Sequence, residues 1–481
     1  MAKEIKTDKR LDLFAATPPL EAKKSLFSFA VTEGIGFQSG DRRGGKKIDF
    51  VDIKRAYFQA DSIREVYVDL PEEDQSPGMC GLLGKSMYGT RDAAQNWGEA
   101  YMSFMTSIGF TKGIGSPCTF YHKLRDLICV VHGDDFTILG WSTQLDWFWK
   151  EVQIKFEAKH RGRIGPDRND EKEMRILNRI VTWTEEGINY EGDQRHVEIC
   201  MENLGLVAES REVGTPIEKE RGGTKEKSEV AAALAKSSAE AAAEEEWLDS
   251  SDSTRYRGLI ARMNYLGQDR SDIQYAVKEL SSYMANPTRN GMSKIKRLIR
   301  YLKGVPRFVT TFGYQDNPNG LTAWSDSDFA GCKKSRKSTS GGLVMHGKHV
   351  IKSWSTNQSV IALSSGEAEY YALVKAASVS IGVKTIMKDM GVELSEPTVI
   401  KSDASAAIGI ANRIGIGEVR HIEVNQLWLQ EKVSKKEIFI EKVGTDDNLA
   451  DALTKAVDAR IIEKHIAGVG ACVRIDRHRL F

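Results

Sequence analysis

The sequence has few cysteines, and none of them stand in a spacing that binds metal. Its six cysteines are scattered along 481 residues without a Cys-x-x-Cys pair, which indicates a reduced intracellular protein without a disulfide framework or a zinc knuckle. It also lacks any apolar run of about 18 residues, and no apolar segment follows its charged amino terminus. We therefore expect neither secretion nor a membrane span.

An excess of one charge sign is missing as well. Lys and Arg together number 68 and Asp and Glu number 67, so any basic surface for nucleic acid must be local. With 41% hydrophobic residues, the chain has room for about three domains with their own cores. The range 218–250 is the exception, because its run of Ala, Glu, Lys and Ser offers no wide apolar face and predicts a low-complexity linker.

The most informative stretch is Ile128–Leu139, in which two short β-favouring runs flank Gly133, Asp134 and Asp135. This pattern predicts a hairpin with adjacent carboxylates at its tip. Adjacent aspartates repel each other, so a fixed pair favours a divalent cation between them. The alternative is an ordinary Gly-Asp turn, since both residues suit turns for local reasons.

A third carboxylate lies upstream, at the end of a second predicted strand. Ile48–Ile53 has the pattern of a half-buried strand, and it carries Asp52 near its end. Beside the hairpin, Asp52 would complete a cage for two metal ions about 4 Å apart, the arrangement that supports nucleotidyl transfer.

Three segments, in order, resemble one family. VDIKRAYFQA, KSMYGTRDAAQNW and VHGDDFTILG are similar to the reverse transcriptase motifs of copia-type retrotransposon Pol polyproteins. The resemblance implies a right-hand palm and thumb with truncated fingers, because the family's fingers strands would precede Met1. It makes Tyr57 a ribose-sensing aromatic, with a core aromatic as the alternative, and makes Tyr88 and Arg91 substrate contacts.

The chain departs from the family pattern at two places. Asp92-Ala93-Ala94 stands where the family has Gln-Ala-Pro, and His132-Gly133 replaces an aromatic and a β-branched residue. His132 could titrate near neutrality, although a filler role is the alternative.

A second set of acids follows in the last third of the chain. Asp326 and Asp403 end predicted strands, Glu367 begins a predicted helix, and Asp451 lies on a predicted late helix. Each acid also has a structural explanation: Ser364 and Glu367 form a capping-box pattern, and Asp403 could cap the next helix.

This set resembles a ribonuclease H domain of the same family. The strings SDSDFAGC, STSGG, ALSSGEAEYYAL, SDASAA and NLADALTK carry the likeness across residues 322–457. It implies that Asp326, Glu367, Asp403 and Asp451 bind two Mg²⁺ or Mn²⁺ ions, as Asp52, Asp134 and Asp135 would at the first site. We leave out Glu369, Asp328 and Asp447, the nearby acids. A basic cluster after the first acid would hold a hybrid duplex by shape, and it comprises Lys333, Lys334, Arg336 and Lys337.

The sequence therefore predicts an α+β or α/β multidomain protein, with a reverse transcriptase palm and thumb followed by an RNase H-like mixed sheet flanked by helices. The expected divisions are palm with a remnant of the fingers at 1–160, primer-grip hairpin and thumb at 161–217, linker at 218–250, helical connecting segment at 251–314, RNase H-like domain at 318–457 and C-terminal tail at 458–481. A basic helix at 293–307 presents either a solvated face or a phosphate-tracking face.

The expected function is RNA-directed DNA polymerase with ribonuclease H activity on RNA–DNA hybrids. The expected partners are an RNA template, a DNA primer, the hybrid and deoxynucleoside triphosphates, but no membrane. The expected location is cytoplasmic, associated with particles, or nuclear. Two alternatives stay open: a catalytically inactive transposon remnant that only binds nucleic acid, and an unrelated two-metal nuclease. The sequence does not define an oligomeric state.

Overall fold

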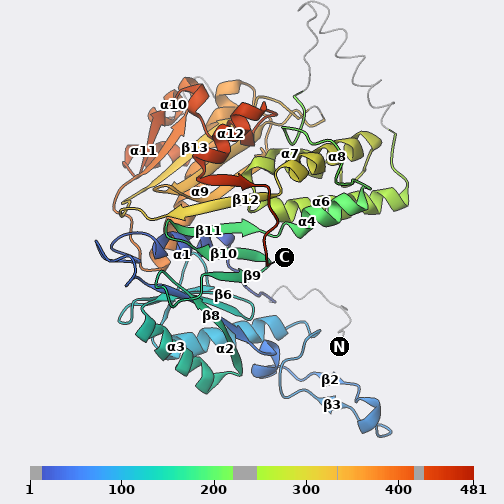
Figure 1. Ribbon diagram of the computed structural model, residues 1–481, viewed down its shortest axis with the longest axis vertical. Helices are drawn as coiled ribbons and strands as arrows, with labels where there is room; N and C mark the ends of the chain where they lie inside the picture. The colour runs from blue at the N-terminus through green and yellow to red at the C-terminus, as the bar shows by residue number, and fades with distance from the viewer. Residues whose placement is uncertain (1–12, 220–245, 333, 416–426, 481) are drawn as a thin grey trace, which may run out of the picture.

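The computed structural model describes residues 13–219, 246–332, 334–415 and 427–480 (Figure 1). Lys333 and most of the predicted linker at 218–250 lie outside the described residues. Within the described ranges the chain forms three sheets of five or six strands and one two-stranded ribbon, together with their helices. The expectation of a protein that combines α-helices and β-sheets is confirmed.

The first sheet has six antiparallel strands, and it carries the first set of acids. Its spatial order is β4 (Thr111–Lys112), β5 (Thr119–His122), β6 (Leu127–His132), β7 (Asp135–Gly140), β1 (Lys47–Ile53) and β8 (Ala158–Ile164). Alternation along β1 sends Ile48 and Phe50 into one core and Val51 and Ile53 into another. Helices α2 (Ala93–Ser107) and α3 (Ser142–Lys155) supply residues to the second of these cores.

The second sheet joins distant parts of the chain. Its five antiparallel strands lie in the order β18 (Ala471–Arg474), β12 (Arg307–Gly313), β11 (Gly187–Gly192), β10 (Arg179–Trp183) and β9 (Glu173–Ile176). The helices of the associated core are α4 (Arg195–Asn203), α6 (Ser250–Gly267), α7 (Gln274–Ser281), α8 (Arg289–Gly304) and α12 (Ala459–Gly468).

The third sheet is mixed, and it carries the second set of acids. Its order is β15 (His349–Asn357), β14 (Thr339–His346), β13 (Leu321–Ser327), β16 (Thr398–Ser402) and β17 (Ile438–Lys442). The strands β13, β16 and β17 are parallel, and the β13–β14–β15 meander is antiparallel. Helix α9 (Ser365–Asp389) packs on β13 and β14, and α10 (Ser405–Asn412) and α11 (Trp428–Ser434) follow it.

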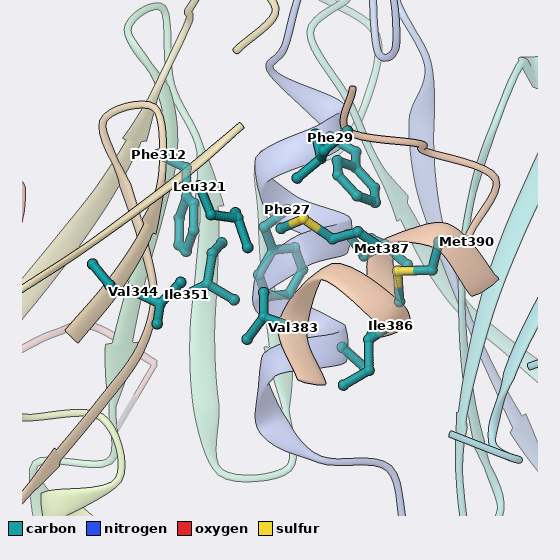
Figure 2. Close-up of a cluster of buried hydrophobic side chains, with 14 of the residues drawn as sticks. Phe27, Phe29, Phe312, Leu321, Val344, Ile351, Val383, Ile386, Met387 and Met390 are labelled. Carbon is teal, nitrogen blue, oxygen red and sulfur yellow. The ribbon is translucent and has the colours of Figure 1, made fainter. Parts of the chain in front are cut away.

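Helix α1 (Leu20–Ala30) is surrounded by the three sheets. All nine residues from Ala22 to Ala30 are buried, so this helix is a core helix on every side. Figure 2 shows Phe27 and Phe29 of α1 beside Met387 of α9 and Met390, the residue that follows this helix. The same cluster includes side chains from the second and third sheets, namely Phe312, Leu321, Val344 and Ile351. The three sheets therefore share one hydrophobic core.

Hydrogen bonds fix α1 to the third sheet. The hydroxyl of Ser28 lies 2.9 Å from Nδ1 of His346 and 2.8 Å from Nδ1 of His349, and all three residues are buried. Nε2 of His349 lies 2.7 Å from the carbonyl oxygen of Gly313, so this nitrogen must carry the proton that it donates. It follows that Ser28 donates to His349 and accepts from His346 when both rings are neutral.

The predicted divisions between palm, thumb, connecting segment and tail need correction. Strand β8 crosses the boundary at 160, and the second sheet takes strands from the predicted ranges 161–217, 251–314 and 458–481. These three ranges pack around one sheet because β12 pairs with β11 on one side and with β18 on the other. No helix of the described residues is long and apolar enough to cross a membrane.

Candidate active sites

The first candidate site lies at the predicted hairpin. Strands β6 and β7 pair up to His132 and Asp135, which leaves Gly133 and Asp134 as a two-residue turn. Gly133 has a φ of 65°, as the first position of a type II′ hairpin turn requires, and its carbonyl accepts a 2.9 Å hydrogen bond from the indole of Trp97. The hairpin prediction is confirmed, and the buried Trp97 holds its tip in place.

Asp52 lies directly opposite Asp135 in the register of β1 and β7. The sheet thus brings together two acids that are 83 positions apart, and Asp134 adjoins them at the turn. A guanidinium lies between them: Nη2 of Arg161 donates to Oδ1 of Asp52 at 2.9 Å, and Nε lies 3.9 Å from Oδ1 of Asp135. The first site therefore pairs its carboxylates with a built-in cation.

Burial shifts the pKa of two groups at this site. It raises the pKa of Asp135, an effect that Arg161 opposes and the charge of Asp134 adds to. Burial, together with the charges of Lys23 and Arg179, lowers the pKa of His132 to about 4. His132 is therefore neutral at neutral pH, so the prediction that it could titrate there is wrong.

Tyr57, one of the predicted substrate-contact residues, lies near the hairpin turn, and Tyr88 stacks on it. The rings of Tyr57 and Tyr88 stack with centroids 4.4 Å apart, and Phe58 meets Tyr88 edge to face. Burial raises the pKa of Tyr57, with smaller contributions from Tyr88 and from Asp134, so the phenol lies within electrostatic reach of the turn. Arg91 is half-buried in the loop that follows Tyr88.

The second candidate site lies at the ends of β13 and β16. Carboxylate oxygens of Asp326, Glu369 and Asp403 all lie within 4.8 Å of one another, and no other group of three or more His, Cys, Asp or Glu in the described ranges is as close. Asp326 is near the end of β13, Asp403 directly follows β16, and Glu369 lies in the second turn of α9. Strand ends and a helix thus position three acids at one point.

The structure corrects one predicted member of this set: Glu369 is in it and Glu367 is not. Glu367 completes the helix cap, because its Oε2 accepts from the backbone N–H of Leu363 at 2.9 Å and its own N–H donates to Ser364. Its other oxygen accepts a 2.7 Å hydrogen bond from Tyr371. Two positions later the helix has turned by about 200°, which carries Glu369 to the sheet.

Asp451 is the fourth acid, and it lies in a short 3₁₀ helix (Asp451–Leu453) rather than on the predicted late α-helix. Its Oδ1 is 3.0 Å from Nζ of Lys455, which also lies 3.9 Å from Oδ2 of Asp326. The hydroxyl of Thr454 donates to the same oxygen of Asp326. Lys455 therefore offsets part of the negative charge, as Arg161 does at the first site.

Crowding and burial raise the pKa of three of these acids. Burial, followed by the charges of Asp326 and Asp403, raises the pKa of Glu369 to about 9. Burial raises the pKa of Asp326 to about 7. It also raises the pKa of Asp451. Oε2 of Glu369 is buried and accepts no hydrogen bond within the described ranges. Carboxylates that repel one another and hold an unsatisfied oxygen fit a divalent cation.

The remaining acids have other positions. Helix α10 begins after Ala404 without a side-chain cap, so the alternative of Asp403 as its cap is not observed. Asp328 accepts the backbone N–H of Thr339, and Asp447 pairs with Lys464 at 2.7 Å. Leaving these two out of the set agrees with their contacts.

The basic cluster lies beyond the end of β13. Lys334 and Arg336 are exposed, Lys337 is half-buried, and Nζ of Lys334 lies 4.7 Å from the ring centre of Tyr283. The predicted basic helix is α8, and part of its basic face is neutralised. Arg297 pairs with Glu218 at 2.6 Å and Lys303 pairs with Glu212 at 3.0 Å, which favours the solvated-face alternative for these two residues.

Sequence reasoning missed Arg161, Thr454 and Lys455 as neighbours of the acids. For Lys455 a local signal existed, because it stands four residues after Asp451 and helical spacing brings such pairs together. Arg161 gave no such signal, because its position depends on how β8 pairs with β1.

Comparison with curated proteins gives relatives along most of the chain. The Pol polyprotein of transposon TNT 1-94 from Nicotiana tabacum is 27% identical over 88% of this chain. The Pol polyprotein of transposon RE1 from Arabidopsis thaliana is 26% identical over 87% of it. The chain belongs to the retrovirus-related Pol polyproteins of copia-type transposons. The Gag-Pol polyprotein of transposon Ty1-DR6 from Saccharomyces cerevisiae is more distant, at 21% identity over 84% of the chain.

This Pol-related chain spans less than a third of the length of these curated relatives: 31% of the TNT 1-94 protein and 27% of the RE1 protein. No protein-family model matches it. Among solved structures, a foamy viral protease-reverse transcriptase in complex with double-stranded DNA aligns with 87% of this chain and 61% of that chain. The alignment has 11% identity and a TM-score of 0.19, which is too low to support an argument about fold.

Proposed function

We propose that the second site hydrolyses the RNA strand of an RNA–DNA hybrid, as a ribonuclease H. The observation that carries the proposal is the convergence of Asp326, Glu369 and Asp403 within 4.8 Å, with one oxygen of Glu369 buried and unsatisfied. The resemblance of this part of the chain to a ribonuclease H domain agrees with that chemistry. RNA–DNA hybrids would be recognised by their shape and their 2′ hydroxyls.

Asp326, Glu369, Asp403 and Asp451 would hold the metal ions at this site. Two bound Mg²⁺ or Mn²⁺ ions would supply the activation of water and the stabilisation of the leaving 3′ oxygen. Thr454 orients Asp326 through its hydroxyl, and Lys455 neutralises Asp451. The exposed Lys334 and Arg336 would bind the backbone of the hybrid.

We propose further that the first site synthesises DNA on an RNA template. Asp52 opposite Asp135, with Asp134 at the turn, is the observation that favours this second activity. Asp52, Asp134 and Asp135 would hold the ions, and the Tyr57–Tyr88 stack would support the sugar and base of the nucleotide. The alternative, an inactive remnant that only binds nucleic acid, has in its favour the departure from the family pattern at His132-Gly133, but the acids of both sites are present in the sequence.

A labelled hybrid tests the ribonuclease H proposal. The purified chain should shorten the RNA strand when Mg²⁺ or Mn²⁺ is present, and Asp326→Asn should abolish this, because Asp326 is the most buried acid of the cluster. Asp447→Asn is the matched control, since Asp447 is exposed and pairs with Lys464 away from the cluster. An intact hybrid after incubation of the wild type with either metal would refute the proposal.

A further inference from the structure

Strand β8 contains a bulge beside the first site. Phe50 of β1 is opposite Gly162, but the next residue, Val51, is opposite His160, so Arg161 has no partner on β1. Gly162 has a φ of 152°, and a Cβ there would lie 2.4 Å from the methyl group of Met174. A glycine therefore suits this position, and such a bulge redirects the side chain of the extra residue.

The bulge directs Arg161 at the carboxylates. Arg161 donates to Asp52 at 2.9 Å and lies 3.9 Å from Asp135, while 44% of its side chain stays exposed. Arg163, two positions later, binds Asp49 and Asp146 on the opposite face of the sheet. Lys159 is opposite Asp52 in the register and is exposed. Arg161 is thus the residue whose guanidinium lies between the two acids.

We infer that Arg161 occupies the cation position of the first site in the free protein and makes metal binding depend on the nucleotide. A divalent ion that enters between Asp52 and Asp135 meets a guanidinium of the same charge sign, so it binds weakly while Arg161 remains there. A guanidinium binds phosphate as well as it binds carboxylate. The triphosphate of a nucleotide would therefore draw Arg161 away from Asp52 and bring its own metal ion.

This inference rests on the proposed polymerase function, and it names the nucleotide triphosphate as the ligand of Arg161. The exposed part of the Arg161 side chain gives the guanidinium room to move. Its pairing with Asp52 is at a partly exposed position, where ion pairs contribute little to stability. Moving the guanidinium of Arg161 from the Asp52 carboxylate to a phosphate therefore costs less free energy than the binding of a nucleotide supplies.

The test measures Mn²⁺ binding to the free protein through the electron paramagnetic resonance of unbound Mn²⁺. The parent protein and all variants carry Asp326→Asn and Glu369→Gln, so that Mn²⁺ binding at the second site does not contribute to the measurement. Without the guanidinium, Arg161→Leu and Arg161→Gln should each bind Mn²⁺ at least about fivefold more tightly than the parent, since even a partly exposed like charge costs that much. Arg161→Lys, which keeps the charge, should stay within about twofold of the parent.

Lys159→Leu is the matched control, because it removes the same charge from the same strand without removing a contact to Asp52. It should stay within about twofold of the parent, since an exposed charge is screened by solvent. An unchanged Mn²⁺ affinity in Arg161→Leu and Arg161→Gln would overturn the inference, and so would an equal gain in Lys159→Leu. Arg161→Gln can still donate to Asp52, so it supplies a folded variant if Arg161→Leu does not fold.

A second readout concerns the nucleotide. In primer extension, Arg161→Leu should raise the KM for a deoxynucleoside triphosphate about tenfold and change kcat by less than about threefold, because a lost phosphate contact mainly weakens binding. A KM equal to that of the wild type would overturn the phosphate contact. If no variant or wild type extends a primer, the polymerase proposal fails, but the Mn²⁺ measurement still decides the position of Arg161.

Discussion

At the residue scale, two glutamates two positions apart have opposite roles. The carboxylate of Glu367 accepts hydrogen bonds at the start of α9 and from Tyr371. Glu369 instead lies beside Asp326 and Asp403, and one of its buried oxygens has no hydrogen-bond partner within the described ranges. We expect Glu369→Gln to lower hybrid cleavage at least about 100-fold, as loss of a metal ligand does, without loss of stability. Glu367→Gln should keep cleavage within a few-fold but unfold about 1 kcal/mol more easily. Cleavage rates and urea unfolding of both variants measure this.

The reverse pattern, with cleavage lost in Glu367→Gln and kept in Glu369→Gln, would show that the site is built on the other glutamate. The sequence contained part of the answer. The capping-box pattern of Ser364 and Glu367 already explained Glu367 by local structure, and the prediction followed the family resemblance instead. Only the packing of α9 on β13 determines which of the two acids faces the sheet.

Two buried histidines make the stability of the fold depend on pH. Burial lowers the pKa of His346 and of His349 to about 4. Below about pH 6.5 these two histidines bind protons in the unfolded chain but stay neutral in the folded chain. The free energy of unfolding therefore falls as the pH decreases from about 6.5 to about 4. From pH 7 to pH 5 we expect a loss of about 2 kcal/mol for each histidine.

Urea unfolding at pH 7 and pH 5 measures this loss. The variant His346→Gln cannot titrate, so it should lose less stability between the two pH values than the wild type does. The charge of Lys348 adds a smaller lowering of the pKa of His349. An equal pH dependence in the wild type and in His346→Gln would contradict the assignment.

At the element scale, the C-terminal strand β18 completes the second sheet. It pairs with β12, and the residues after it form ion pairs: Asp476 with Arg307 at 2.6 Å, and His478 with Glu173 at 2.9 Å. Deletion of residues 471–481 removes this ladder and leaves the buried Arg307 with Glu191 as its carboxylate partner. We expect it to lower the free energy of unfolding by about 2 kcal/mol.

Thermal and urea unfolding measure the effect of the deletion. Arg479→Ala is its control, since that side chain is 80% exposed and an exposed ion pair contributes less than about 1 kcal/mol. A deletion as stable as the wild type would show that β18 adds nothing to the sheet.

Helices and strands whose own residues show a hydrophobic periodicity could be predicted from the sequence. Strands that form only because they pair with a distant strand could not. The β6–β7 hairpin and β1 followed from short apolar runs and a Gly-Asp turn. Strand β18 has only four residues, too few to show a periodicity, and it exists through its pairing with β12. The bulge at Arg161 is likewise a property of register, which depends on two segments more than 100 positions apart.

At the scale of the whole molecule, α1 joins the sheets that carry the two sites. Ser28 bonds to His346 and His349 of the third sheet, and other residues of the helix pack on β6 and β7. Ser28→Ala leaves two buried imidazole nitrogens without their partner, so we expect a loss of about 2 kcal/mol. Amides of β6 and of β14 should then exchange with solvent faster, since both sheets share one core.

Hydrogen exchange followed by mass spectrometry measures this coupling. Ser434→Ala is the control, because its hydroxyl is exposed and bonds only within its own helix. Faster exchange in β14 alone would show that the two sheets open independently. The shared core also explains why domain boundaries were the weakest sequence prediction: segments far apart in the chain close the same sheet.

One experiment tests the central claim that two separate carboxylate sites in one chain perform two reactions. An RNA template annealed to a labelled DNA primer is incubated with Mg²⁺ and deoxynucleoside triphosphates, and both strands are followed. We predict that the wild type extends the primer and cuts the RNA, that Asp135→Asn only cuts, and that Glu369→Gln only extends. Loss of both reactions in each variant, or neither reaction in the wild type, would contradict the account.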